Sequence, residues 1–520
     1  MRHTAAISDI HLCEPEPGDG LWMRWRQAAY SPEGEIAAML DALRREVHGE
    51  ELELVLNGDV FDFDAPRNRQ GQTVFHDFPR DAAHDAPALE AILDTHPVFV
   101  EAIGRVLADG HTLVVVSGNH DAQLTLPEVR EVLRRRVVEA ALAAAPGADR
   151  ADLEARVVFR AWFHKTPDGI LIEHGNQYDA YCSFRYPMAP YGRNEGVIQP
   201  TLGSLAFRSM ICREGYINPH IDSTFIMSAW GYVAHWARYW LFSRRSLVAL
   251  WAAGSVRTLL ELVRWREPER LARRRECLRA AAQETGAPLR ALARHARLFE
   301  RPVEDRPILI ARQLWLDRAA MILVGGLLTA LWILFAPADL LAGVVLAPTA
   351  LLAYEMAAPK LPLGASWLGI RRAARAVARA HGARAVIFGH THHPEGFWED
   401  GVFYGNSGGW SVAFADVACT RPYYPERPLV WLWSDGEQLG GGLMAWKDGR
   451  FEERTVRLSR SSAPEIQPEI QPEPALEPAP ALSPSLEAMP ASLASPASRR
   501  PSFDALLPGS SALSQCRSPG

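Results

Sequence analysis

Four apolar runs in this sequence end in the same way, in glycine and polar side chains. The runs are ELELVLNGD, HTLVVVSGNHD, GILIEHGN and ARAVIFGHTH, and they end at Asp59, Asp121, Asn176 and His392. Short runs rich in valine, isoleucine and leucine are typical of buried strands. Segments with helical periodicity precede three of the runs, at about residues 36–48, 88–108 and 369–382. The pattern therefore predicts an α/β fold.

The polar residues at these strand ends form a candidate site. Open α/β sheets bind ligands beyond the carboxyl ends of their strands, so we expect the groups to share one crevice. Carboxylates, an amide and imidazoles suit manganese, iron or zinc, and the absence of cysteine argues against a structural zinc site. The candidate ligands are Asp9, His11, Asp59, Asn119, His174, His390 and His392. Seven groups exceed the need of one ion, whereas two ions that share a carboxylate would use them all.

In chain order the motifs read SDIHL, NGDVFD, SGNHD, EHGN and FGHTH. This set resembles the calcineurin-like metallophosphoesterase family, over residues 1–180 and about 380–457. The resemblance implies a four-layer sandwich, in which two mixed β-sheets are flanked by helices. It also implies two divalent ions, with manganese expected and iron or zinc as alternatives. One ion would be held by Asp9, His11, Asp59 and His392 and the other by Asp59, Asn119, His174 and His390, so that Asp59 bridges them.

The same resemblance assigns a catalytic role to His120. It follows the ligand Asn119 in the SGNHD motif, and we expect it either to stabilise charge on the phosphoryl oxygens or to protonate the leaving group. Asp121 is predicted to hold the imidazole of His120 in the required tautomer. Asp62 is predicted either to orient a ligand or to cap a turn. His393 matches no motif position, and we expect it to face solvent.

About 200 residues separate His174 from His390, too many for a loop. We expect residues 181–380 to form a mainly helical cap. At its start, Asn176, Arg185 and Arg193 are predicted to bind substrate, although a packed aromatic connection with surface arginines is the competing interpretation. The resulting domain prediction is a first core part at 1–180, the cap, a second core part at 381–460, and a tail at 461–520 that is rich in proline, alanine and serine and is expected to be disordered.

Residues 319–358 contain two apolar runs, Ala319–Ala336 and Leu340–Ala353, separated by Pro337 and Asp339. The first run has about the length of a membrane-spanning helix, and arginine and lysine flank the pair on both sides. These features predict a hairpin that enters a membrane from the cytoplasmic face. The alternative is a buried hairpin within the cap of a cytoplasmic protein.

Charge and cysteine content restrict the partners and the compartment. The formal net charge is -6, so the chain has no general basic field, and nucleic acid is not an expected partner. The six cysteines are scattered without a CxxC pair, which favours a reducing compartment.

Together these features predict a hydrolase that uses two metal ions to cleave a phosphomonoester, a phosphodiester or a pyrophosphate, and a lipid-linked substrate is one candidate. A more remote resemblance is to the UDP-2,3-diacylglucosamine hydrolases, from which the chain departs in its GNHD motif and its far longer insertion. Two alternatives are a nuclease resembling the SbcD group, which shares GDVFD and GNHD, and a non-catalytic membrane scaffold on the same fold.

Overall fold

The computed structural model of the 520-residue chain describes residues 1–14, 31–75, 77, 80–186, 188–191, 196–212, 247–265, 270–335, 345, 349–354, 356, 366–411, 413–414, 422–423 and 426–457. Arg193, the tail at 461–520 and most of the second apolar run lie outside these residues.

The first of two large sheets has seven strands in the order β18-β17-β16-β1-β2-β6-β7. Four adjacent strands run parallel to one another: β1 (Arg2–Ile7), β2 (Glu51–Asn57), β6 (Thr112–Val116) and β7 (Val157–Arg160). The C-terminal strands β16 (Arg427–Ser434), β17 (Leu439–Lys447) and β18 (Arg450–Glu453) add an antiparallel edge beside β1. The sheet is therefore mixed, and the carboxyl ends of β1, β2 and β6 lie side by side.

The second sheet has six strands in the order β19-β12-β13-β11-β9-β8. Its centre is parallel, with β11 (Ala385–Phe388) between β13 (Val402–Asn406) and β9 (Ile170–Glu173). The strands β8 (Phe163–Lys165) and β12 (Glu395–Glu399) run antiparallel to their partners, and β19 (Val456–Arg457) lies at one edge. This sheet joins segments from both sides of the long insertion, so β9 and β11 end next to each other.

Alternation along the strands places one apolar layer between the sheets and another outside the first sheet. In β2, Val55 belongs to a buried cluster shared by both sheets, which includes Ile387 of β11 and Phe403 of β13. The flanking residues of β2, Leu54 and Leu56, point to the other face of the sheet. The two sheets therefore pack against each other through one set of side chains.

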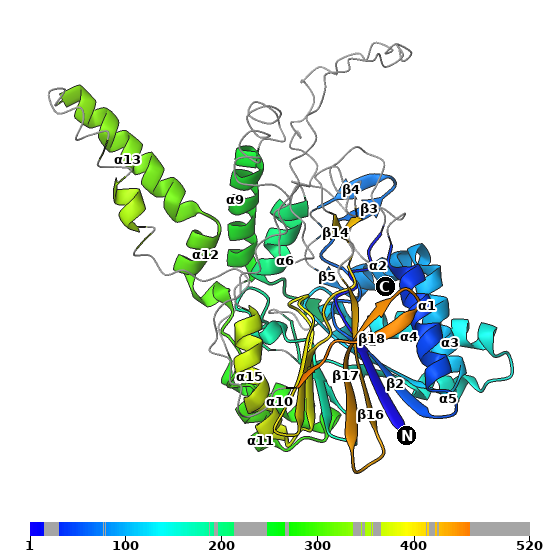
Figure 1. Cartoon of the computed structure of the whole chain (residues 1–520). Coiled ribbons are helices and arrows are strands. Elements are labelled where there is room, and N and C mark those ends of the chain that lie inside the picture. The colour runs from blue at the N-terminus through cyan, green and yellow to red at the C-terminus, as the bar shows by residue number, and fades with distance from the viewer. Residues whose placement is uncertain are drawn as a thin grey trace, which may run out of the picture. The chain divides into compact units, whose positions relative to one another are not determined.

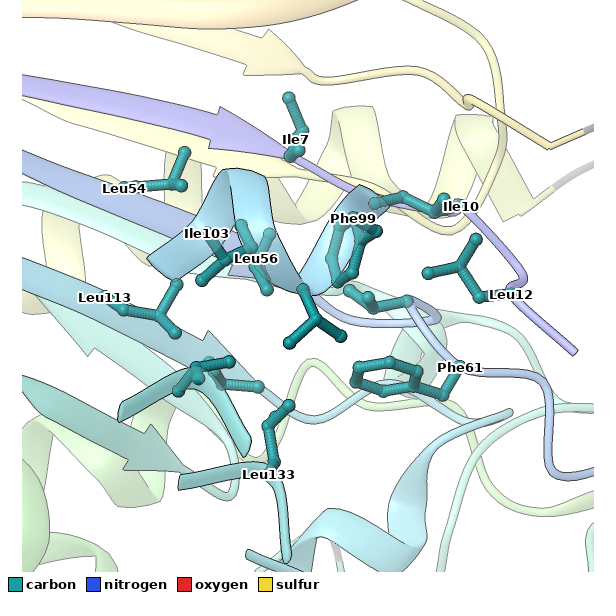
Figure 2. Packing of buried hydrophobic residues seen from close by; sticks show 14 of the residues in the cluster. Ile7, Ile10, Leu12, Leu54, Leu56, Phe61, Phe99, Ile103, Leu113 and Leu133 are labelled. Atoms are coloured by element: carbon teal, nitrogen blue, oxygen red, sulfur yellow. The ribbon is translucent and has the colours of Figure 1, made fainter. Parts of the chain in front are cut away.

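Helices cover the outer face of the first sheet. Figure 2 shows Leu54, Leu56 and Leu113 of the strands beside Phe99 and Ile103, which belong to α3. Burying a side chain of this size contributes about 1.5–3 kcal/mol. The helices of this layer are α1 (Glu33–Glu46), α2 (Ala82–Thr95), α3 (Pro97–Ala108) and α4 (Pro127–Ala144).

The outer face of the second sheet is covered by α10 (Leu271–Thr285), α11 (Leu289–His295) and α15 (Ser366–His381). All three come from the stretch 181–380 that was predicted to form a separate cap, and Met1–Ala463 forms one compact unit. These helices bury their apolar faces on the strands, so this part of the stretch packs on the core. The coarse prediction, an α/β protein with two mixed sheets and several helices, is confirmed (Figure 1).

The remaining described part of the insertion packs around its own small core. Leu205 of α6 (Leu202–Ala206), Leu262 of α9 (Leu247–Trp265) and Ile310 of α12 (Pro307–Gln313) share this cluster. A π-helical turn, η5 (Phe207–Ile211), follows α6 directly. We call α6, η5, α9, α12 and η7 (Val303–Asp305) the cap. The short elements are β3 (Arg67–Arg69), β4 (Gln72–Val74), β5 (Arg80–Asp81), β10 (Val197–Ile198), β14 (Ala413–Phe414), β15 (Pro422–Tyr423), α5 (Arg150–Ala155), η3 (Ala122–Thr125) and η4 (Asn176–Tyr178).

The apolar run at 319–336 lies almost wholly in α13 (Leu316–Phe335). This helix is long and apolar enough to cross a membrane, with a mean hydropathy of 2.0, and none of it is buried. Among the residues described, it does not pack as a buried helix of the cap.

Candidate metal centre

The two sheets bring the predicted ligands to one edge. Asp9 and His11 follow β1, Asp59 follows β2, and Asn119 follows β6 in the first sheet. His174 follows β9, and His390 and His392 follow β11, in the second sheet. Each polar group thus stands where a parallel strand ends, as expected for ligand sites in α/β sheets.

Asp9, His11 and His392 form one cluster, in which their candidate ligand atoms lie within 4.8 Å of one another. The Nε2 atoms of His11 and His392 are 3.3 Å apart. Nε2 of His392 is 3.2 Å from Oδ1 of Asp9. Two imidazole nitrogens and a carboxylate oxygen that converge in this way can hold a metal ion.

Asp59, His174 and His390 form a second cluster within the same 4.8 Å limit. Nε2 of His174 lies 3.1 Å from Oδ2 of Asp59. Nδ1 of His174 donates a hydrogen bond of 2.9 Å to the carbonyl oxygen of Asn57. That bond fixes the tautomer and leaves the Nε2 lone pair available for a ligand.

Unsatisfied buried atoms support a metal at both clusters. Within the part of the chain that the structure describes, Oδ1 of Asn119 is buried and makes no hydrogen bond, and the buried Oδ1 of Asp9 and Nε2 of His174 face only other candidate ligands, His392 and Asp59. A buried polar atom without a partner costs about 1–3 kcal/mol. A bound cation would satisfy all three atoms, so the residues present fit the predicted group.

The backbone at the ligands adopts an unusual conformation. Asp9, His11, Asp59, His390 and His392 all have positive φ, between 53° and 68°. A non-glycine residue in this region costs about 1 to 3 kcal/mol and persists only where the surroundings enforce it. The surroundings do so here, because the amide of Asp9 donates to the carbonyl oxygen of Gly58 at 3.1 Å and the amide of His390 donates to Oδ2 of Asp9 at 3.0 Å. Such concentrated strain is characteristic of functional sites.

Two glycines are required by the close approach of the ligands. A Cβ atom on Gly58, whose φ is +80°, would lie 2.5 Å from the ring of His174. A Cβ atom on Gly118 would lie 2.3 Å from Oδ1 of Asp59. Both distances are too short for non-bonded atoms, so the NGD and SGN motifs need glycine for the clusters to form.

His120 lies beside the first cluster. Its ring is 4.8 Å from that of His11, edge to face, and its amide donates a hydrogen bond of 2.7 Å to Oδ1 of Asp59. Its Nδ1 atom is 3.0 Å from Oδ1 of Asp62 and 3.6 Å from Oδ2 of Asp64. Asp62 therefore orients the ring of His120.

The prediction that Asp121 holds His120 is wrong. Oδ1 of Asp121 accepts a hydrogen bond of 2.6 Å from the amide of Gly118, and Oδ2 accepts one of 2.8 Å from the amide of Val60. Asp121 thus joins the loop after β2 to the loop after β6. The carboxylate points at the backbone because two buried amides need an acceptor.

Burial and the carboxylates set the protonation states of the side chains without metal. Burial by itself lowers the pKa of His120, but the charges of Asp62 and Asp59 outweigh it and raise the pKa to about 10. His174 behaves similarly, with burial opposed by Asp59 and Asp9 and a pKa of about 9. The pKa of Asp59 is lowered despite its burial, because the imidazoles of His174 and His120 stabilise its charge. Bound cations would lower the pKa of the neighbouring imidazoles again.

Of the predicted substrate-binding residues, Asn176 lies closest to the ligands in the chain and lines a pocket with His174 and Gly175. Its side-chain amide donates to the carbonyl oxygen of Cys182 at 3.0 Å. Arg185 instead forms a bidentate pair with Asp305, at 2.8 and 3.0 Å. The guanidinium of Arg185 is therefore paired with a carboxylate of the cap, a contact that the sequence did not predict.

Sequence reasoning missed two features of the site. Asp179, 3.3 Å from Nε2 of His390 through its Oδ2 atom, forms a further cluster with Cys182 and His390. The side chain of Asn406 donates to the carbonyl oxygen of Gly389 at 2.7 Å and supports the loop that carries His390. His393, on the same loop, is exposed, as expected.

Comparison with models of known protein families finds no match for this chain. A search among curated proteins finds no match either.

Proposed function

We propose that this chain is a metal-dependent phosphohydrolase with the metallophosphoesterase fold. The observation that carries the proposal is the meeting, at one edge of two sheets, of two His/Asp clusters with the ring of His120 beside them. A pair of metal sites with an adjacent proton donor suits phosphoryl transfer to water.

Two divalent ions would be held by these residues, with Asp59 available to both. Asp9, His11 and His392 would hold the first ion, and Asn119, His174 and His390 would hold the second. The ligands are oxygen and nitrogen atoms of intermediate hardness, so manganese is the proposed metal, with iron or zinc as substitutes. When bound, two such ions polarise the phosphoryl oxygens and lower the pKa of water enough to supply hydroxide near neutral pH.

His120 supplies the proton or the positive charge that the reaction needs. Asp62 accepts a hydrogen bond from Nδ1 of His120 at 3.0 Å, and in the protonated ring Nε2 carries a second hydrogen that can be offered to substrate. Either the leaving oxygen receives that proton or a phosphoryl oxygen is stabilised by it. Asp62 and Asp64, 3.0 and 3.6 Å from Nδ1 of His120, favour the protonated ring.

The substrate class is a phosphomonoester, a phosphodiester or a pyrophosphate, with a lipid-linked phosphate favoured. The lipid component is favoured by the exposed apolar helix α13, which would bring the enzyme to the surface where such substrates reside.

A substrate panel tests the proposal. Purified protein is loaded with manganese, iron or zinc and assayed with p-nitrophenyl phosphate, bis-p-nitrophenyl phosphate and a lipid diphosphate in detergent micelles. We expect metal-dependent turnover of at least one substrate, abolished by His120→Ala and unchanged in the matched control His393→Ala. No turnover with any metal, or equal turnover in His120→Ala, would contradict the proposal.

A further inference from the structure

Helix α13 exposes large apolar side chains on every side. Ile322, Leu323 and Val324 are 60%, 74% and 55% exposed. Consecutive residues of an α-helix are about 100° apart around its axis, so these three side chains alone surround the helix. A helix that is apolar all round is matched by a hydrocarbon environment, whereas a partner helix would cover a single face.

Arginine and aromatic side chains form a collar at the start of α13. The guanidinium carbon of Arg318 lies 5.2 Å from the ring centre of Trp315, which is 63% exposed. That of Arg312 lies 5.5 Å from the ring centre of Tyr354. Aromatic rings and arginines gather at the level of lipid headgroups when a helix enters a bilayer.

The second arm of the apolar segment returns to this collar. Residues 349–354 are helical, and the hydroxyl of Tyr354 donates a hydrogen bond of 2.5 Å to Asp317 near the start of α13. Leu352 and Met356 of this arm are exposed. The two ends of the segment therefore meet on one side, as a re-entering hairpin requires.

We propose that α13 inserts into the hydrocarbon core of a phospholipid bilayer, with Trp315, Arg318 and Tyr354 of the collar at anionic headgroups. At 1.5 Å per residue, the 17 residues from Ala319 to Phe335 extend about 25 Å, most of the thickness of about 30 Å of that core. The inference depends on the shape and chemistry of α13 and not on catalysis.

Vesicle flotation tests this insertion with the full-length protein. Vesicles of phosphatidylcholine with 30% phosphatidylglycerol are mixed with wild type, with Leu323→Asp/Leu327→Asp, or with the control Leu271→Asp, which alters an exposed leucine of α10. We expect wild type and control to float and to stay bound in high salt and in alkaline carbonate, and the double variant to remain at the bottom with its metal content unchanged.

Three outcomes would overturn the insertion. Wild type could stay at the bottom, it could be released by salt alone, or it could form a detergent-free dimer that does not float, in which case a second copy covers α13. None of these readings uses enzyme activity, so failure of this inference is distinguishable from failure of the proposed function.

A second inference concerns the contacts between the cap and the loop that carries Asp62. Arg208, in the π-helical turn η5, is fully buried. It donates to the carbonyl oxygens of Phe63, Asp64 and Ala65 at 2.6, 2.9 and 2.8 Å and pairs with Asp77. These carbonyl groups belong to the loop that carries Asp62.

The preceding residue, Phe207, contacts His120 itself. The two rings are 5.2 Å apart and meet edge to face at 89°. One turn of the cap therefore holds both the ring of His120 and the loop of its partner Asp62. Turns of π-helix are frequent at functional sites.

We infer that Phe207 and Arg208 are positioning residues for His120, a role that rests on the proposed function. Phe207→Leu should lower kcat about tenfold with KM and metal content nearly unchanged, because a small misplacement of a catalytic group costs this much or more. Phe207→Tyr, which keeps the ring, should restore kcat. Arg208→Met should lower kcat further, since three carbonyl groups lose their donor.

A double-mutant cycle separates this inference from the catalytic proposal. Unfolding is measured for Phe207→Leu, for His120→Ala and for the two together. Coupling between the two changes supports direct positioning whether or not a substrate has been found. Additive effects, or a fall in kcat that Phe207→Tyr does not restore, would show that Phe207 is merely structural.

Discussion

Asp62→Asn is the most informative single substitution, because it removes a charge with little change in shape. The Oδ1 atom remains able to accept the amides of Asp64 and Ala65, which now lie at 3.1 and 2.9 Å. What is lost is the charged acceptor 3.0 Å from Nδ1 of His120. The substitution therefore tests the His120–Asp62 pair and not the folding of the loop.

The size of the effect follows from the protonation of His120. Without metal, Asp62, Asp59 and Asp64 together raise the pKa of His120 to about 10. Asp62 therefore supplies only part of the stabilisation of the imidazolium. A hydrogen bond to a charged group contributes about 1.5–3 kcal/mol, which predicts a fall in kcat of about 10- to 150-fold.

The assay combines turnover of the best phosphate ester found in the substrate panel with elemental analysis of the same protein. Asp94→Asn, which alters an exposed carboxylate of α2 that pairs with Arg136, is the matched control and should retain both activity and metal. A kcat within twofold of wild type would refute the pairing argument. Loss of metal from Asp62→Asn would instead identify Asp62 as a ligand, since it also lies within a cluster with His11 and His120.

Three further results are expected. Asp59→Asn should reduce bound metal to less than one equivalent per chain by elemental analysis, because both proposed sites use this carboxylate; two full equivalents would exclude bridging. His120→Ala should keep its metal but lose about two to four decades of kcat, and near-normal turnover would remove His120 from the mechanism. Burial raises the pKa of Glu304 in the cap from 4.5 to about 7. Between these pH values the folded protein keeps the proton on Glu304, whereas the unfolded chain has lost it. The free energy of unfolding should therefore fall by up to about 3 kcal/mol as pH rises from 4.5 to 7. Glu304→Gln should remove that fall in chemical denaturation measured against pH, and an unchanged slope would show that Glu304 is charged in the folded protein.

The strands and the ligand positions could be predicted from the sequence because they depend on local patterns. Apolar runs that end in GD, GNHD and GHTH fix both the strand and the place where its polar residues emerge. Strand pairing then brings these ends to one edge, whereas the division of the ligands into two groups was implied by the family resemblance.

The contacts of Asp62 and Asp121 could not be predicted in the same way. Both residues follow a glycine motif closely, but which carboxylate faces His120 depends on the turns between them. The carboxylate of Asp121 accepts hydrogen bonds from the amides of Gly118 and Val60, and it is Asp62 that contacts the ring of His120. Periodicity carries no information on such competition between acceptors.

Long-range partners within the insertion were also beyond the sequence. Arg185 pairs with Asp305, which is 120 residues away, and Arg208 binds carbonyl groups of residues 63–65. The three helices over the second sheet show the same limit. Their amphipathic pattern predicts a buried face but does not say whether the cap or the sandwich buries it.

Anomalous diffraction from crystals of the manganese-loaded protein, recorded above and below the manganese absorption edge, tests the central claim most directly. We predict two anomalous peaks about 3.5 to 4 Å apart, one bounded by Asp9, His11 and His392 and the other by Asn119, His174 and His390, with Asp59 between them. A single peak, or peaks away from the edge where β1, β2, β6, β9 and β11 end, would contradict the dinuclear centre and the phosphohydrolase proposal built on it.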